Sequence, residues 1–286
     1  MRIRSLAVFV TTLAFARVGS AQSVGNMLKD DFKNAGKDIL SVWGSPFDAS
    51  GRDWALVAAS LGVFGVSMLA DQEVSDWAIR NDTGSFFRAL KPVRRGGKLF
   101  SGKYVVPPVA AAYVVGIAIK NQDMRDFVMG CMASWVSESP PRRAVAHLIG
   151  RARPDTTESP ATVAPNDPGI WKLGGGGEWV MRSFPGGHFA NAMGCATFWN
   201  KRFRLGIAEP ALYALATAVG VGRLGDKAHW FSDTVIGGIL GYAVGSEVAR
   251  RQLSRLPAPG ASGASAASFN LAPSDGGVRM SMTWTF

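Results

Sequence analysis

The stretch GRLGDKAHWFSD, from Gly222 to Asp233, places an arginine, a histidine and an aspartate in a mostly apolar region. His229 follows Arg223 by six residues, and Asp233 follows His229 by four. If a helix begins near His229, the imidazole and the carboxylate lie one turn apart on one face. A carboxylate there can fix the imidazole tautomer, and Arg223 adds a planar cation suited to oxyanions. A capped helix with a surface ion pair would fit the same residues, so the flanking sequence has to decide.

Six apolar stretches surround this segment, and each is predicted to form a helix. They are long and rich in Ala, Leu, Gly and Met, and none alternates with the two-residue period of a strand. They comprise residues 54–70, 104–119, 127–149, 188–199, 210–221 and 229–248. The sequence therefore predicts an all-α domain over residues 53–256, preceded by a polar segment, residues 22–52, with an amphipathic helix.

The first 21 residues, MRIRSLAVFVTTLAFARVGSA, predict a secretory signal peptide. Arginines precede a short apolar core, and small residues occupy the positions that a signal peptidase reads. With cleavage after Ala21, we expect an exported protein that is periplasmic, or membrane-associated with its functional site outside the cytoplasm. An uncleaved membrane anchor is the alternative.

The composition indicates a folded, basic chain. Hydrophobic residues make up 47% of the 286 residues and charged residues 18%, which excludes general disorder. The net charge of +10 favours an anionic partner such as a phospholipid, a phosphate ester or a nucleic acid. We expect no nucleic-acid partner, because the chain has an export signal and lacks a basic stripe with interleaved aromatic residues.

The sequence leaves open whether the apolar stretches cross a membrane. A span needs about 20 apolar residues, and the first two stretches are slightly short, whereas residues 229–248 are the best candidate. The basic loop KPVRRGGK, residues 91–98, would favour the cytoplasmic side if the first two stretches do span. The alternatives are a partly inserted bundle and a soluble helical core.

Residues 257–286 predict a linker followed by a β-hairpin. Residues 257–268 are rich in Ala, Ser, Gly and Pro. Two strand-like runs then flank Asp275-Gly276-Gly277, and the second alternates apolar and polar residues up to Phe286. This ending is typical of the last strand of an outer-membrane barrel, but one hairpin cannot close a barrel. We expect the hairpin to pack on the domain or on a partner.

Two further polar motifs lie at the ends of apolar helices. AHLIGRARP, residues 146–154, places Arg151 and Arg153 after a helix, where two guanidinium groups can clamp a phosphate. A stop-transfer charge cluster is the alternative reading of that motif. SFPGGHFANAMG, residues 183–194, leads a glycine turn into a helix that starts near His188, and such a helix N-terminus is an anion site.

Glycines and cysteines in the helices predict packing rather than chemistry. Gly237, Gly241 and Gly245 repeat every four residues and would let two helices approach closely. Cys131 and Cys195 are the two cysteines of the chain, each in an apolar helical stretch. They can form a disulfide in an exported protein or stay as buried thiols, and the sequence leaves both open.

Taken in chain order, these motifs resemble the signature of the type 2 phosphatidic acid phosphatase/vanadium haloperoxidase superfamily. The family pattern is Lys-x6-Arg-Pro, then Pro-Ser-Gly-His, then Ser-Arg-x5-His-x3-Asp. The matching residues are Arg153 and Pro154, then Pro185, Gly187 and His188, then Arg223, His229 and Asp233. The resemblance covers roughly residues 125–250 and implies a six-helix bundle of the acid phosphatase/haloperoxidase type.

The resemblance also implies a role for each matching residue. His229 would attack phosphorus as the nucleophile, with Asp233 orienting it, and His188 would protonate the leaving oxygen and then activate water. The residues expected to bind phosphate are Arg153, Arg223, Gly187, Gly186 and Arg151. The family reaction needs no metal and no cofactor, and the sequence shows no metal-ligand cluster.

Three positions depart from the family pattern. The lysine falls at Ala146, and the two serines fall at Gly186 and Gly222. One cation and two hydroxyls are therefore missing from the expected phosphate site, and the loss of one such donor can cost about 10² to 10³ in rate. Arg143 or Arg151 could supply the missing charge.

The sequence thus predicts an exported, metal-independent phosphohydrolase that acts at a membrane. Its expected substrate is a phosphorylated small molecule, or a lipid phosphate or pyrophosphate. Residues 155–183 predict a long loop that shapes access to the site, where Trp171 and Trp179 could cover a lipid or an aromatic leaving group. The alternatives are a vanadate-dependent haloperoxidase and a non-catalytic envelope protein that binds anionic lipid on the same fold.

Overall fold

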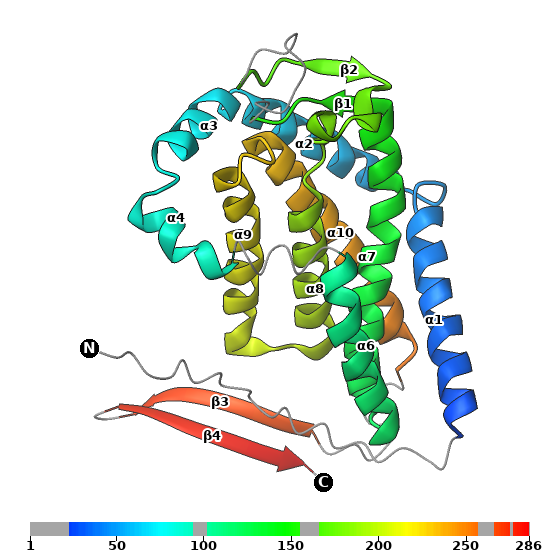
Figure 1. The fold of residues 1–286 in the computed structure, drawn as a ribbon. Coiled ribbons are helices and arrows are strands. Elements are labelled where there is room, and N and C mark those ends of the chain that lie inside the picture. Colours follow the sequence, from blue (N-terminus) through cyan, green and yellow to red (C-terminus); the bar gives the residue numbers. More distant parts are fainter. Residues whose placement is uncertain (1–22, 94–101, 155–165, 257–265, 275–276, 286) are drawn as a thin grey trace.

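The computed structural model describes residues 23–93, 102–154, 166–256, 266–274 and 277–285, and it is mostly helical (Figure 1). The predicted signal peptide, residues 1–21, lies outside these residues. So do most of the basic loop 91–98 and most of the linker 257–268.

Each of the six predicted apolar stretches corresponds to a helix. These helices are α2 (Gly51–Met68), α6 (Gly102–Ala118), α7 (Gln122–Leu148), α8 (Gly187–Phe203), α9 (Glu209–Gly225) and α10 (Phe231–Ser254). Three others are α1 (Val24–Gly44), which is the amphipathic helix expected in the polar segment, α3 (Asp71–Arg80) and α4 (Ser85–Ala89). The domain is therefore larger than the six predicted helices alone.

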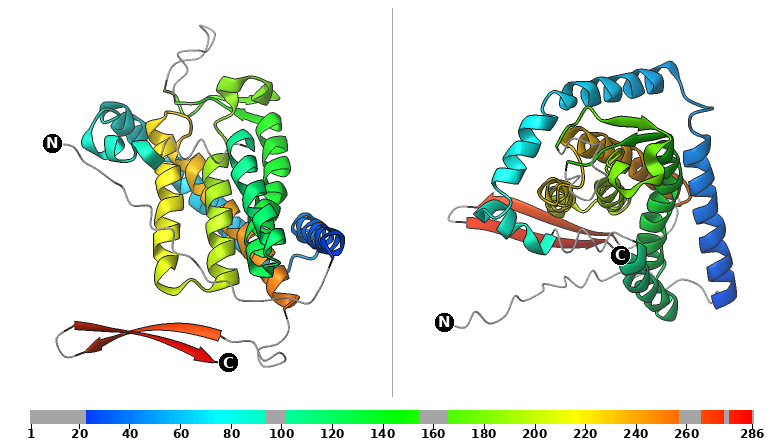
Figure 2. Two further views of the ribbon diagram at one scale, coloured as in Figure 1. Left: turned by 60° about the horizontal axis from the view of Figure 1, so that its bottom comes forward. Right: turned by 45° about the horizontal axis from the view of Figure 1, so that its top comes forward.

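Helix α8 lies inside the helical body, against α7, α9 and α10 (Figures 1 and 2). Where α7, α8 and α10 meet, Phe198 packs with Ala133 and Val248. The phenyl ring fits because residue 130 is glycine, where a Cβ would lie 1.9 Å from the Phe198 ring. A second apolar cluster joins α8 to α9 and is built from the small residues Ala192, Ala196, Ala216 and Val219.

The predicted glycine ladder brings α10 against α8. A Cβ at Gly237 would lie 2.4 Å from the carbonyl oxygen of Gly186, and one at Gly245 would lie 2.3 Å from that of Gly194. Real side chains do not tolerate such distances, so only glycine permits this approach. The packing role predicted for these glycines is confirmed.

A disulfide joins Cys131 of α7 to Cys195 of α8. Sixty-four residues separate the two cysteines in sequence. The bond therefore links α7 and α8, and the candidate site described below lies at the C-terminal end of α7 and the N-terminal end of α8. Disulfides of this kind persist in oxidising compartments.

The segment predicted as a long loop is partly ordered into short elements. The strand β1 (Ile149–Arg151) pairs antiparallel with β2 (Trp171–Leu173), and the 3-10 turns η2 (Gly175–Gly177) and η3 (Trp179–Met181) follow. A continuous loop over 155–183 is thus wrong for the described part, residues 166–183. Three-residue strands are too short to leave a periodic pattern in the sequence.

At the C-terminal end, β3 (Ala266–Ser274) and β4 (Gly277–Thr285) pair antiparallel. The register runs from Ala266 opposite Thr285 to Ser274 opposite Gly277. The two strands thus flank residues 275 and 276, the position at which the sequence predicts a turn.

None of the helices in the described part of the chain is, taken alone, long and apolar enough to cross a membrane. The sequence favoured residues 229–248 as a span, but α10 does not meet this requirement. Helices α2 and α3 together meet it by length and composition, with a bend of 53° between them.

Candidate active site

The three polar motifs meet where α7 ends and α8 and α10 begin, beneath the β1–β2 pair (Figure 1). A cavity of about 400 Å³ opens there. Its walls include Arg142, Arg153, Phe184, Gly187, His188 and His229. The rings of His188 and His229 lie 6.5 Å apart between centroids. Both predicted catalytic histidines therefore face one cavity.

His229 lies in the connection between α9 and α10, two residues before α10 begins. The residue is 6% exposed, and its Nδ1 lies 2.6 Å from the carbonyl oxygen of Ser183. A carbonyl oxygen only accepts hydrogen bonds, so Nδ1 carries the proton and Nε2 keeps its lone pair. This tautomer gives the imidazole a nucleophilic nitrogen.

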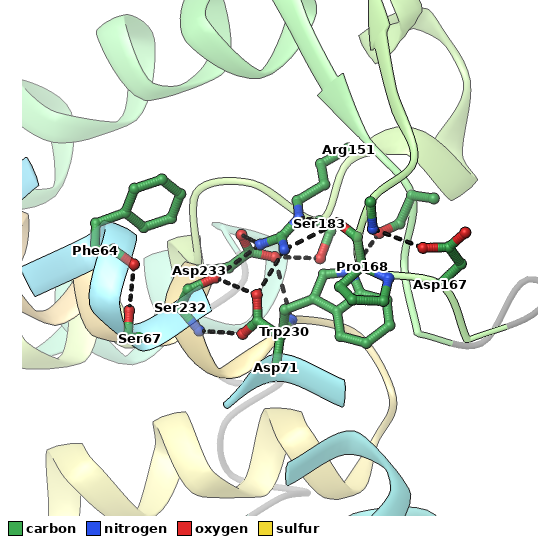
Figure 3. Close-up of polar contacts among 12 residues, drawn as sticks. Phe64, Ser67, Asp71, Arg151, Asp167, Pro168, Ser183, Trp230, Ser232 and Asp233 are labelled. Atoms are coloured by element: carbon green, nitrogen blue, oxygen red, sulfur yellow. Dashed lines mark hydrogen bonds and ion pairs between the residues drawn. The ribbon is translucent and has the colours of Figure 1, made fainter. Parts of the chain in front are cut away.

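Asp233 does not contact the imidazole in the way the sequence predicted. Its carboxylate accepts hydrogen bonds from the Ser183 hydroxyl, the Trp230 N–H and the Arg151 guanidinium (Figure 3). The predicted one-turn spacing fails because the helix begins at Phe231, after His229. Ser183 bridges the two instead, since its hydroxyl donates to Asp233 and its carbonyl accepts from His229.

Arg151 is not placed to bind phosphate, contrary to the sequence-based expectation. Its side chain is 0% exposed. The guanidinium lies 2.6 Å from Asp233 and 2.6 Å from Asp71, and it also donates to Ser232 and to the Pro168 carbonyl (Figure 3). Both carboxylates and Ser232 are buried, so Arg151 neutralises two carboxylates within the fold.

Asp71 is a residue of this network that the sequence did not reveal. It begins α3, and its carboxylate accepts from the backbone N–H and the hydroxyl of Ser232 as well as from Arg151. Asp71 precedes Arg151 by 80 positions and belongs to none of the three motifs. No local signal in the sequence could have identified it.

The cavity concentrates positive charge around the two histidines. Burial, followed by the charges of Arg223, Arg142 and Arg153, lowers the pKa of His188 to about 4. Burial and the charges of Arg223 and Arg153 also hold the pKa of His229 well below its ordinary value. The same crowding and burial lower the pKa of Arg153 to about 10. An anion in the cavity would therefore be bound strongly and would favour protonation of His188.

The glycine turn before α8 divides into two different roles. The Gly186 N–H donates to the carbonyl oxygen of Asp233 at 2.9 Å, so it does not serve the phosphate-binding role expected of it. A Cβ at Gly186 would lie 2.7 Å from the same oxygen, which explains why glycine stands where the family has serine. Gly187 is the first residue of α8 and lines the cavity, with the N–H orientation of a helix N-terminus.

Arg142 is a cavity residue that the sequence analysis missed. Its guanidinium lies on Gly187, where a Cβ would be 2.4 Å from Cζ. Its Nε donates to the buried carboxylate of Glu138 at 2.9 Å. The spacing of four between Glu138, Arg142 and Ala146 on α7 was the available signal.

Residues 127–255 match the family model of the PAP2 superfamily, a range that encloses both histidines and Arg142, Arg153 and Arg223. This match identifies residues 127–255 as a PAP2 domain. A PAP2 domain thus accounts for α7 to α10, whereas α1 to α6 lie before the matched range.

A curated relative and a solved structure are similar to this chain. A lipid A 1-phosphatase of Porphyromonas gingivalis is 36% identical over 70 residues, which is 23% of this chain and 15% of the relative. The alignment therefore spans only a small part of that relative's length. A crystal structure of a transmembrane PAP2-type phosphatidylglycerolphosphate phosphatase from Bacillus subtilis is 16% identical, with a TM-score of 0.47 over 71% of this chain and 98% of that one.

Proposed function

We propose that this chain is a phosphohydrolase that removes phosphate from a lipid phosphate, a lipid pyrophosphate or a related phosphate monoester. The observation that carries the proposal is the pair of histidines, buried His229 and half-buried His188, facing one arginine-lined cavity. The neutral tautomer of His229 supports its role as nucleophile, and PAP2 membership together with the lipid A 1-phosphatase relative supports a lipid phosphate as substrate.

In the first step, the His229 Nε2 lone pair attacks phosphorus and forms a phosphohistidine. The bond between phosphorus and the leaving oxygen breaks, and His188 donates a proton to that oxygen. Arg153, Arg223 and the N-terminal turn of α8 stabilise the charge on the phosphoryl oxygens in the transition state.

In the second step, His188 removes a proton from water, and the hydroxide attacks the phosphohistidine. Phosphate leaves and His229 returns to its neutral form. His188 begins this step neutral, because it gave its proton to the leaving oxygen in the first step, and its low pKa in the unliganded protein shows that the surroundings favour this neutral form. Binding of the substrate dianion raises the pKa again and so prepares His188 as the acid for the first step.

Asp233 contributes by positioning in this mechanism. It holds the Ser183 hydroxyl, and the Ser183 carbonyl holds the Nδ1–H of His229. Through Ser183, the carboxylate of Asp233 stabilises the positive charge that develops on the imidazole of His229 during the reaction.

The outer surface of α2 supports a membrane-bound substrate. From Trp54 to Met68 the helix carries no charged residue. Its exposed apolar side chains are Trp54, Leu56, Val57, Leu61, Val63 and Val66. On the same helix, the ring centroid of Phe64 lies 5.3 Å from that of Phe184, which lines the cavity. An apolar helix that reaches the cavity wall suits a lipid whose headgroup enters the site.

The predicted signal peptide and the disulfide favour an active site outside the cytoplasm.

The test is phosphate release from p-nitrophenyl phosphate, phosphatidic acid and a polyprenyl pyrophosphate, with wild type compared with His229→Ala. We expect turnover in the wild type and at least a 10³-fold loss in the variant, since the attacking atom is gone (an order-of-magnitude expectation for a lost nucleophile). Labelled substrate should leave a base-stable phosphoryl group on the wild type and none on His229→Ala.

Other outcomes have distinct meanings. Full turnover in His229→Ala would disprove the nucleophile. Tight vanadate binding with no turnover on any substrate would make the chain a binding protein, and bromide oxidation by peroxide with added vanadate would indicate a haloperoxidase.

A further inference from the structure

We infer that Arg142 is a phosphate-binding residue of this site and that it takes the place of the family lysine, which is absent at Ala146. The inference rests on the proposed function, because it assigns one more contact to the same substrate. It departs from the family motif, in which position 142 has no assigned role.

The position of the Arg142 guanidinium carries the inference. Its Cζ and both terminal nitrogens lie within 2.7 Å of the point where Gly187 would carry a Cβ. The guanidinium therefore rests on the first residue of α8, at the positive end of the helix and beside His188. Its charge is among those that lower the pKa of His188, so it acts on the reacting region of the cavity.

Glu138 fixes the guanidinium in this place. Its carboxylate is buried and accepts from the Nε of Arg142, one helical turn away on α7. An arginine held through Nε still presents its two terminal nitrogens, which are the pair that binds an oxyanion in bidentate fashion. The side chain is 15% exposed, so this orientation is kept within a largely enclosed site.

The other cations near the missing lysine are placed differently. Arg143 is exposed, although it lies along the same cavity. Arg151 is committed to Asp71 and Asp233, and the Arg182 guanidinium donates to the carbonyls of Gly176 and Gly177. Arg142 is thus the group best placed to replace the lysine charge.

The experiment compares Arg142→Ala with Arg80→Ala, a control that removes the same charge from an exposed arginine of α3 outside the cavity lining. We expect Arg142→Ala to lower kcat/KM for p-nitrophenyl phosphate by about 10² to 10³, the usual loss for one oxyanion donor. Inhibition by inorganic vanadate should weaken at least tenfold (an order-of-magnitude expectation for one lost charge-assisted contact). Arg80→Ala should change both by less than about threefold, because exposed charges outside the cavity act weakly through water.

Two companion variants guard against a folding defect. Removing Arg142 leaves the buried Glu138 without its cation, so Glu138→Gln/Arg142→Ala keeps the same loss of phosphate contact without the buried charge. Arg142→Ala/Ala146→Lys returns a cation at the family position. Ala146 lines the cavity, and this variant should recover at least tenfold of the lost kcat/KM (an order-of-magnitude expectation from one restored donor).

The outcomes separate the inference from the proposed function. The inference would be overturned if Arg142→Ala kept wild-type activity and vanadate affinity, or if Arg80→Ala lost as much of both. Either result would leave the phosphohydrolase proposal intact. If the wild type releases no phosphate from any substrate, the proposed function fails. Vanadate affinity measured by calorimetry would then decide the role of Arg142 alone.

Discussion

Arg151 and Arg153 are two positions apart, yet they have opposite surroundings. Arg151 sits between the buried carboxylates of Asp71 and Asp233. Arg153 lines the cavity, and the charges of Arg223 and Arg182 act against its protonation. One arginine therefore balances charge inside the fold, and the other adds to an excess of positive charge that a substrate can neutralise.

We predict that alanine at these two positions separates stability from activity. Arg151→Ala leaves two buried carboxylates uncompensated and should lower the free energy of unfolding by about 3–5 kcal/mol. Arg153→Ala relieves repulsion among cations, so it should destabilise far less while kcat/KM falls by about 10² to 10³. Urea unfolding and phosphate release check the pair, and equal destabilisation by both would contradict this assignment.

His188 gives a pH dependence whose sign follows from its environment. Its pKa is about 4 in the folded protein and 6.5 as the ordinary value, so the unfolded chain binds more protons between these limits. Stability should therefore fall as the pH decreases from about 6.5 toward 4. The contribution of this residue reaches roughly 3 kcal/mol at the acid end.

His188→Gln removes that contribution and supplies the check. Between pH 7 and pH 4.5 the variant should lose less unfolding free energy than the wild type, measured by denaturant titration at each pH. His229 also has a lowered pKa, so acid destabilisation should shrink without vanishing. Identical pH profiles for the two proteins would show that His188 is not held neutral in the cavity.

The residues of the site were predictable from sequence wherever the motif spacing carries the geometry. The placement of His188, His229 and Arg153 at one cavity was predictable because the three motifs occur along the chain in the same order as in the family signature. Long-range partners could not be predicted in this way, because Asp71 meets Arg151 only through the packing of α3. The contact between Asp233 and His229 was mispredicted because apolar Trp230 and Phe231 conceal where α10 begins.

At the scale of elements, the contact between α8 and α10 links packing to the site. Gly237 meets the carbonyl of Gly186, directly before the cavity residue Gly187, whereas Gly245 meets that of Gly194 two helical turns further along. The two glycines are equally tight but differ in distance from the cavity. They form a natural pair for separating the two effects.

We predict that Gly237→Ala and Gly245→Ala each destabilise the protein by about 1–3 kcal/mol, since each Cβ forces the backbones apart. Gly237→Ala should also raise KM, because the displaced Gly186 carries the N-terminus of α8 with it. Gly245→Ala should leave the KM of the folded protein unchanged. Thermal unfolding and kinetics below the transition test both, and an equal change in KM would mean that α8 moves as one rigid body.

The helices show which parts of a fold a sequence makes visible. Long apolar runs such as 127–149 predicted α7. The four-residue spacing of the glycines in α10 predicted the close packing of α10 against another helix, which is α8. The helices α3 and α4 were not predicted from the sequence, because they are short and carry polar residues such as Asp71 and Arg88. The three-residue strands β1 and β2 were not predicted either, because their pairing depends on tertiary contacts rather than on a local sequence pattern.

For the whole molecule, a basic cavity and an apolar helix α2 occur side by side. Phe64 of α2 contacts Phe184 at the cavity wall, and Phe184 in turn lies 5.6 Å from Trp171 of β2. This aromatic contact connects the outer face of α2 with the charged site. A phosphorylated lipid combines the same two properties, an apolar tail and an anionic headgroup.

We predict that α2 delivers the substrate from a membrane. Val57→Asp/Leu61→Asp places two charges on adjacent turns of its exposed face, which should abolish binding to phospholipid vesicles because apolar burial at the interface drives such binding. Hydrolysis of phosphatidic acid in vesicles should fall with it, whereas turnover of p-nitrophenyl phosphate should stay within about twofold, since the cavity is untouched. Ile207→Asp, a more exposed apolar position between α8 and α9, is the control and should keep both activities. Vesicle co-sedimentation together with the two assays decides, and unchanged vesicle turnover in the double variant would assign membrane contact to another surface.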